Sequence, residues 1–215
     1  MKNLKSIIND LNLIDENDEV FKEALELLLD FSNLKISVME KGIKENLISG
    51  TFIGSDFKVP ISHILSTYSG QIVKNSENEN TIINNVFTSL AEAFHCNKDM
   101  IDSIMKNIEK KLIEFMQGED KEIKFSFLAL EGMSIVRYDL TFYIKSLNSK
   151  KIREKVQCNL PYVIVKSAVN LRQLPFNDFF PFCAKVMAEY FGEDQNKIRT
   201  TLDEMRDIYS FNRLS

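Results

Sequence analysis

The clearest pattern in the sequence is an alternation of apolar and polar side chains between Ser134 and Ser149. Neighbouring strand residues point to opposite faces of a sheet, so this alternation predicts a long strand with one apolar and one polar face. The apolar face consists of Val136, Tyr138, Leu140, Phe142 and Ile144. The polar face carries Arg137, Asp139, Thr141, Tyr143 and Lys145. Because charged groups do not suit a dry layer, we expect the polar face to be wet or only loosely covered by helices.

The same period of two continues on both sides of this strand. A strand is predicted over residues 123–130, with Glu131 and Gly132 making a tight reversal, and another follows Pro161 over residues 162–172. The apolar positions of that last strand are Val163, Val165, Val169 and Leu171. Residues 122–172 are therefore predicted to form antiparallel strands in a meander.

Apolar residues recur at helical spacing in the segments that flank these strands. These segments are residues 1–34, a helical hairpin over residues 81–117, and C-terminal helices over residues 178–210. Residues 35–80, punctuated by Gly42, Gly50 and Gly54, give a mixed signal and are predicted to be strand and loop. The middle and C-terminal hairpins share their spacing, which fits a duplicated hairpin or, more simply, two similar amphipathic hairpins.

Helices that are segregated from a block of strands predict an α+β fold. The chain has 215 residues, of which 44 % are hydrophobic, and this is enough for one core of ordinary size. We therefore expect residues 1–215 to form a single α+β domain with a central antiparallel β-sheet flanked by amphipathic helical hairpins.

The net charge and the lengths of the apolar runs bear on which partners and which cellular compartment are expected for this protein. The formal charge of −4 comes without a clustered excess of Lys and Arg, so nucleic acid is not an expected partner. The N-terminus lacks the apolar run of a signal peptide, and nowhere do 18 uncharged apolar residues run together. The sequence predicts a chain that is synthesised in the cytoplasm, although release by lysis or by a non-classical secretion route would leave no trace of this kind.

Few residues are candidates for catalysis or metal binding. Neighbouring helix residues project about 100° apart, so His95 and Cys96 do not suit a shared metal site. Cys96, Cys158 and Cys183 are an odd count without CxxC spacing, which favours neither disulfides nor zinc, and Cys183 is interpreted as a buried structural thiol. A Cys and His nucleophile pair would need a proximity that sequence does not define. Phosphate-loop, dinucleotide and hydrolase motifs are missing, so no enzyme, no cofactor and no metal is predicted.

The two longer strands point to membrane action as one hypothesis. A membrane-spanning strand needs about 9 to 11 residues with one apolar and one polar face. Residues 135–146 and 162–172 meet both conditions, as does any antiparallel strand with one wet face.

The order of elements from about Asp15 to Phe191 resembles the Cyt family of cytolytic delta-endotoxins. The similar segments are FKEALELLLDF, FKVPISHIL, the hairpin IINNVFTSLAEAFHCNKDMIDSIMKNIEKKLIEF, and the strands IVRYDLTFYIKSL and YVIVKSAVNLRQL. The resemblance implies a sheet wrapped by helical hairpins, no catalytic residues, and direct binding and permeabilisation of lipid membranes. It also implies that Val136 to Ile144 and Val163 to Leu171 contact lipid or line a pore.

Two hypotheses of function follow. The first is a non-enzymatic, toxin-like protein that binds or permeabilises a lipid membrane. The second is a cytoplasmic interaction or adaptor protein whose exposed helical face, around residues 179–191, binds a protein partner or a second copy of the chain. The aromatic run FNDFFPF motivates the second hypothesis.

Overall fold

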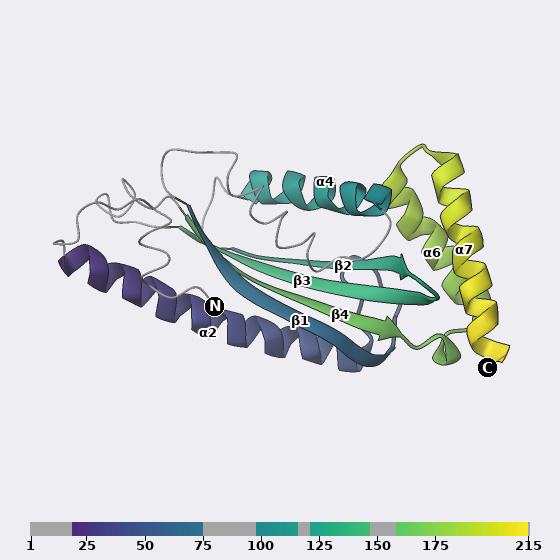
Figure 1. The fold of residues 1–215 in the computed structure, drawn as a ribbon, viewed down its shortest axis with the longest axis horizontal. Coiled ribbons are helices and arrows are strands. Elements are labelled where there is room, and N and C mark those ends of the chain that lie inside the picture. The colour runs from purple at the N-terminus through teal and green to yellow at the C-terminus, as the bar shows by residue number, and fades with distance from the viewer. Residues whose placement is uncertain (1–18, 75–97, 116–120, 147–157, 215) are drawn as a thin grey trace.

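The computed structural model describes residues 19–74, 98–115, 121–146 and 158–214 (Figure 1). The described strands form one antiparallel sheet in the order β1-β4-β3-β2. The strands are β1 (Ile61–Lys74), β2 (Lys121–Glu131), β3 (Ser134–Ser146) and β4 (Cys158–Val169). The helices are α2 (Glu19–Ser49), α4 (Lys98–Phe115), α6 (Phe176–Phe191) and α7 (Gln195–Leu214), with a short 3₁₀ helix η1 (Leu171–Gln173). The predicted α+β class is confirmed.

Helices cover both faces of this sheet. Figure 1 shows α2 running along one face and α4 along the opposite face. The pair α6 and α7 packs at the end of the sheet where β2 and β3 are joined by a turn. Gly132 in that turn has a φ of 56°, a backbone conformation that glycine adopts without a steric penalty.

The two layers have separate apolar cores. The larger core joins β2, β3 and β4 to α4, α6 and α7. The smaller core lies between α2 and β4 and contains Met39, Ile43 and Leu47 with Val163 and Val165. Because the three α2 residues are spaced four apart, they form one side of the helix and meet the sheet together.

A polar contact supplements the smaller core. Asn159 of β4 is fully buried and its Nδ2 donates to Ser32 Oγ of α2, and more weakly to Leu28 O at 3.5 Å. Ser32 Oγ in turn donates to Leu28 O at 2.8 Å within the same helix. The α2 layer is therefore held by a short apolar stripe and by this hydrogen-bonded group.

The structure corrects the prediction for residues 35–80 only in part. Residues 50–74 are loop and strand as predicted, and residues 75–80 lie outside the described residues. Residues 35–49 are not strand and loop, since α2 continues to Ser49. The alternation of Ile36 and Val38 misled the prediction, because the spacing that governs this segment is that of the buried residues Met39, Ile43 and Leu47. The helix ends before Gly50, which has a φ of 70°.

Within the segment predicted to be strand and loop, residues 61–74 form one continuous strand, β1. One further boundary differs from the prediction. Leu171, predicted to belong to the last strand, lies in η1. Of the hairpin predicted over residues 81–117, the second helix is α4. The first helix lies outside the described residues, as do residues 1–18 of the helical segment predicted over residues 1–34; the rest of that segment belongs to α2.

Candidate functional site

Three polar residues of β3, Arg137, Asp139 and Thr141, are buried on the face that carries α2, whereas Tyr143 and Lys145 are half-buried. Arg137 is fully buried and Asp139 is 3 % exposed. Arg137 donates from Nε to Asp139 Oδ2 and from Nη2 to Asp139 Oδ1, both at 2.7 Å, and Ser126 Oγ donates to Oδ1 at 2.6 Å. Burial raises the pKa of Asp139, whereas the bonds from Arg137 and Ser126 act in the opposite direction. At Arg137 and Asp139 the prediction of a wet or loosely covered face is wrong, because these groups are buried and satisfy one another.

The other donors of Arg137 hold residues 50–59, the segment that links α2 to β1. Nη1 donates to Val59 O at 2.8 Å and to Gly50 O at 3.4 Å, and Nη2 donates to Thr51 O. The segment also closes on itself, since Val59 N–H donates to Gly50 O at 2.8 Å. Arg137 therefore ties residues 50–59 to the middle of the sheet.

The strand residues predicted to contact lipid are buried and do not share one face. Val136, Tyr138, Leu140, Phe142 and Ile144 belong to the larger core, on the side of α4, α6 and α7. Val163 and Val165 face α2, because the register places them opposite Thr141 and Asp139. Val169 and Leu171 are buried as well. Lipid could reach all of these side chains only if both helical layers left the sheet.

The aromatic segment FNDFFPF forms the first turns of α6, and much of it faces inward. Phe179 and Phe182 are buried, and the ring of Phe182 packs against Phe52 and Phe57 with centroids 5.2 and 4.5 Å apart. Phe180 is half-buried and lies under the guanidinium of Arg206 on α7. The rings that motivated a partner surface on this helix therefore mainly join α6 to α7 and to residues 50–59.

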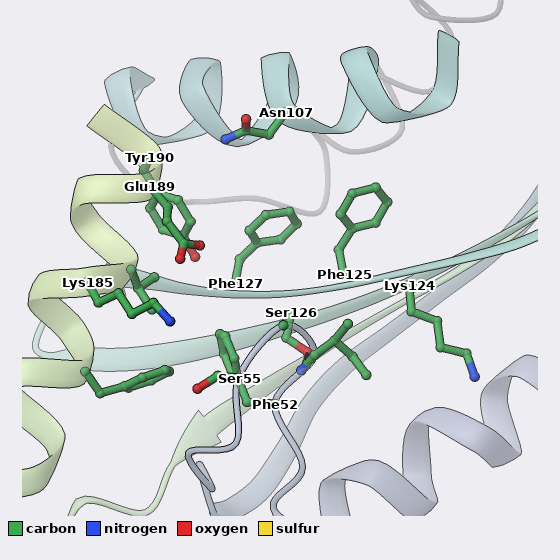
Figure 2. A pocket seen from close by; sticks show the side chains of 14 residues that line it. Phe52, Ser55, Asn107, Lys124, Phe125, Ser126, Phe127, Lys185, Glu189 and Tyr190 are labelled. Atoms are coloured by element: carbon green, nitrogen blue, oxygen red, sulfur yellow. Dashed lines mark hydrogen bonds between the residues drawn. The ribbon is translucent and has the colours of Figure 1, made fainter. Parts of the chain in front are cut away.

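A pocket of about 380 Å³ opens along the outer edge of β2 (Figure 2). Figure 2 shows the rings of Phe125 and Phe127 rising from β2 toward α4, with Phe52 on the other side of the strand. Phe182 and other α6 side chains close one end of the pocket. The pocket thus combines an aromatic wall with the edge of a sheet.

The backbone of β2 faces this pocket at alternate residues. Leu128 N–H points away from β3 and donates to Tyr190 Oη at 2.9 Å. In an antiparallel ladder this direction alternates, so the N–H and C=O groups of Ser126 and Lys124 also point outward. The side chain of Ser126 lies on the face of the sheet that carries α2, where it donates to Asp139 and where Ile53 N–H donates to its Oγ at 3.0 Å. Within the described residues, β2 pairs with β3 alone.

The rim of the pocket is polar and of mixed charge. Lys185 and Glu189 of α6 and Asn107 of α4 border it (Figure 2). Lys124 lies at the far end and pairs with Glu122 at 2.8 Å. This lining can bind an extended backbone and accept a bulky apolar side chain.

This pocket was not predicted from the sequence. Its walls come from four segments that are far apart along the chain, residues 52–55, α4, β2 and α6. Of the aromatic run FNDFFPF noted in the sequence, only Phe182 lines the pocket. The period-two pattern of β2 could have shown that Phe125 and Phe127 share a face, but not that the strand lies at an edge of the sheet.

The described residues offer little for other kinds of chemistry. They contain no group of three or more His, Cys, Asp or Glu residues that could hold a metal ion. Burial raises the pKa of the Cys183 thiol, which lies in the larger core. His63 is exposed on β1, whereas His95 and Cys96 lie outside the described residues. None of the described helices combines the length and the hydropathy that crossing a membrane requires.

Comparisons with known proteins give no relative from which function could be inferred. No family model matches the chain, and neither a curated protein nor a solved structure gives a significant match. The resemblance to the Cyt family of cytolytic delta-endotoxins therefore stays a prediction.

Proposed function

We propose that this protein is a non-enzymatic binding module that takes up an extended segment of a partner protein along the outer edge of β2. The observation that carries the proposal is the coincidence of two features in one place. The outward backbone groups of Lys124 and Ser126 lie beside a pocket with an aromatic wall. A peptide backbone is the partner that matches a row of alternating N–H and C=O groups.

The strand edge would bind the partner's backbone, and the pocket would bind one of its side chains. Backbone hydrogen bonds to a sheet edge contribute about 0.5 to 1.5 kcal/mol each and are insensitive to the partner's sequence. A bulky apolar side chain placed against Phe125, Phe127 and Phe182 would contribute about 25 cal/mol for each Å² of apolar area buried. The pocket therefore selects segments in which such a side chain occupies one position of an extended strand.

A peptide-library selection on the full chain tests this proposal. We expect it to enrich short segments with a bulky apolar anchor and no proline beside it. Binding of an enriched peptide, measured by fluorescence anisotropy, should be lost in Lys124→Pro, because proline removes an outward N–H from the edge while the ladder to β3 is retained. It should also be lost in Asn107→Trp, which fills the pocket from α4.

A matched control exists on the same helix. Lys106 is exposed and does not line the pocket, so Lys106→Trp adds the same ring one position away and should leave binding unchanged. The proposal is overturned if the selection enriches no peptide, or if enriched peptides bind Lys124→Pro and Asn107→Trp as tightly as they bind the wild-type chain.

Membrane binding is the second candidate, and a feature of α2 favours it. This helix carries apolar residues on its outward side as well as toward the sheet. Leu27 and Leu34 are 64 % exposed and Val38 is 54 % exposed, and their spacing of seven and four places them on one face. Because the α2 layer has its own small core, its release would bare further apolar area with less disruption than release of the other layer.

Dye release from zwitterionic and anionic liposomes tests this second candidate. We expect leakage from the wild-type chain and a clear loss in Leu34→Asp, whose side chain is exposed and therefore changes the outward face without disturbing the fold. The exposed polar residue Ser37 provides the control Ser37→Asp. Absence of both leakage and liposome co-sedimentation would exclude this candidate.

A further inference from the structure

The opposite edge of the sheet is formed by β1, most of which lacks the charged residues and proline that usually protect such an edge. Between Ile61 and Val73 the strand ISHILSTYSGQIV contains no Lys, Arg, Asp, Glu or Pro. Soluble proteins usually place charges or proline on a long edge strand, because open N–H and C=O groups otherwise recruit another strand. Two irregularities, at Ile61/His63 and Ile64/Ser66, interrupt the pairing of β1 with β4 near its start. From Ser66 onward the register is regular to Lys74.

This edge is open among the described residues. β4 is the one strand that pairs with β1 there, on its inner side. The backbone N–H and C=O groups of a strand point alternately to its two neighbours in an antiparallel sheet. Because Leu128 N–H points away from β3, the registers of β2, β3, β4 and β1 place the backbone groups of Thr67 and Ser69 on the outer side of β1. Both residues are exposed, as are the apolar side chains of Ile64 and Leu65, at 41 % and 45 %.

We propose that β1 pairs with β1 of a second copy of this chain, so that two sheets join into one continuous antiparallel sheet across a two-fold axis. An antiparallel strand meets itself in a self-complementary way about such an axis, which is the commonest symmetry of homodimers. Charge is compatible with this occupant, since a charged residue at or beside the two-fold axis would lie next to its own copy. The uncharged stretch of β1 carries none.

The regular part of β1 defines the register of the pairing. When Ser66–Lys74 of one copy pairs over its whole length with the same residues of the second copy, the two-fold axis passes through Gly70. Lys74 then lies opposite Ser66 of the other copy, so the two lysines do not meet. About eight backbone hydrogen bonds would form, two for each pair of outward-facing residues. Gly70 has no Cβ, and the ring of Tyr162 occupies the space that one would fill, with Oη 2.8 Å from the ideal Cβ position. The centre of the interface therefore has a small residue on the edge strand, which allows two backbones to approach closely.

The arrangement leaves the β2 pockets free. Because β1 and β2 are opposite edges of the sheet, the dimer would carry one pocket at each outer end. The inference does not depend on what the pocket binds. It would, however, make the assembly bivalent toward a partner with two binding segments.

Sedimentation of the full chain over a wide concentration range tests the proposal. We expect a species of twice the chain mass of 24.9 kDa, in reversible equilibrium with monomer. Ser69→Pro should weaken the dimer about tenfold or more, because both copies lose an outward N–H while the bonds to β4 remain. Ser69→Lys, which keeps the N–H and adds a charge beside the axis, should weaken it as well and does not depend on tolerance of proline.

The β2 variant Lys124→Pro is the matched control, since it places proline on the other edge and should leave the dimer intact. A wild-type chain that sediments as a monomer at every concentration overturns the proposal. So does a dimer that persists in both Ser69 variants, and a dimer lost in Lys124→Pro would assign the contact to β2. Peptide binding measured on the same variants separates the two proposals, because the Ser69 variants should retain it.

Discussion

Arg137 and Asp139, two residues apart on β3, form a doubly hydrogen-bonded ion pair in a layer closed to solvent. Residues on one face of a strand are separated by two positions, so their side chains lie side by side under residues 50–59. The pair is a buried ion pair on the face of the sheet that carries α2. It connects the loop after α2 to the middle of the sheet.

Removal of one partner of this pair should be far more damaging than removal of a surface charge. Asp139→Asn leaves the Arg137 charge buried without its counter-ion, and we expect a loss of about 3 to 5 kcal/mol in the free energy of unfolding, measured by urea denaturation. Asp203→Asn removes a carboxylate that pairs with Arg206 on the surface at 3.2 Å, and should cost at most about 1 kcal/mol. Similar losses in both variants would contradict the role of burial.

The contact of α2 with the sheet can be tested with two neighbouring residues. Met39 is 2 % exposed in the smaller core, and Met39→Ala should lower the free energy of unfolding by about 2 to 5 kcal/mol. Val38 points outward, and Val38→Ala should change it by no more than about 0.5 kcal/mol. Equal effects in chemical denaturation would mean that α2 is rotated relative to this structure.

Substitution by alanine should change the free energy of unfolding in opposite directions at two glycines. At Gly70 a Cβ would lie 2.8 Å from Tyr162 Oη, so Gly70→Ala should destabilise the fold by about 1 to 3 kcal/mol through overpacking. At Gly42, within α2, nothing lies within 4 Å of the new Cβ, and Gly42→Ala should stabilise the fold by about 0.5 to 1 kcal/mol. Thermal unfolding distinguishes the two, and a stabilised Gly70→Ala would show that Tyr162 moves aside.

The hydroxyl of Tyr190 should protect one amide at the edge of β2. Tyr190→Phe leaves Leu128 N–H without its acceptor, and we expect a cost of about 1 to 3 kcal/mol. Hydrogen exchange provides the local measurement, with faster exchange expected at the Leu128 amide. The Phe127 amide, which faces β3, serves as the internal control. Unchanged exchange at Leu128 would mean that another group covers this edge.

The sequence alone determined the α+β class and most of the strands. The turn at Glu131 and Gly132, the period of two in β3 and the helical period of α6 and α7 depend on neighbouring residues, so local sequence carries them. The same reasoning failed at residues 35–49, because Gly42 and the alternation of Ile36 and Val38 hid a helix whose evidence is the buried face it shares with β4.

Only the tertiary structure decided which side chains meet. The polar face of β3 was predicted to be wet or only loosely covered by helices. Arg137 instead donates to Asp139 on its own strand and to the carbonyls of Gly50, Thr51 and Val59 in a distant loop. The pocket likewise depends on strand order, since Phe125 and Phe127 lie beside open backbone groups only because β2 is an edge. Strand order and loop closure are contacts between residues remote in the chain, and periodicity carries no information about them.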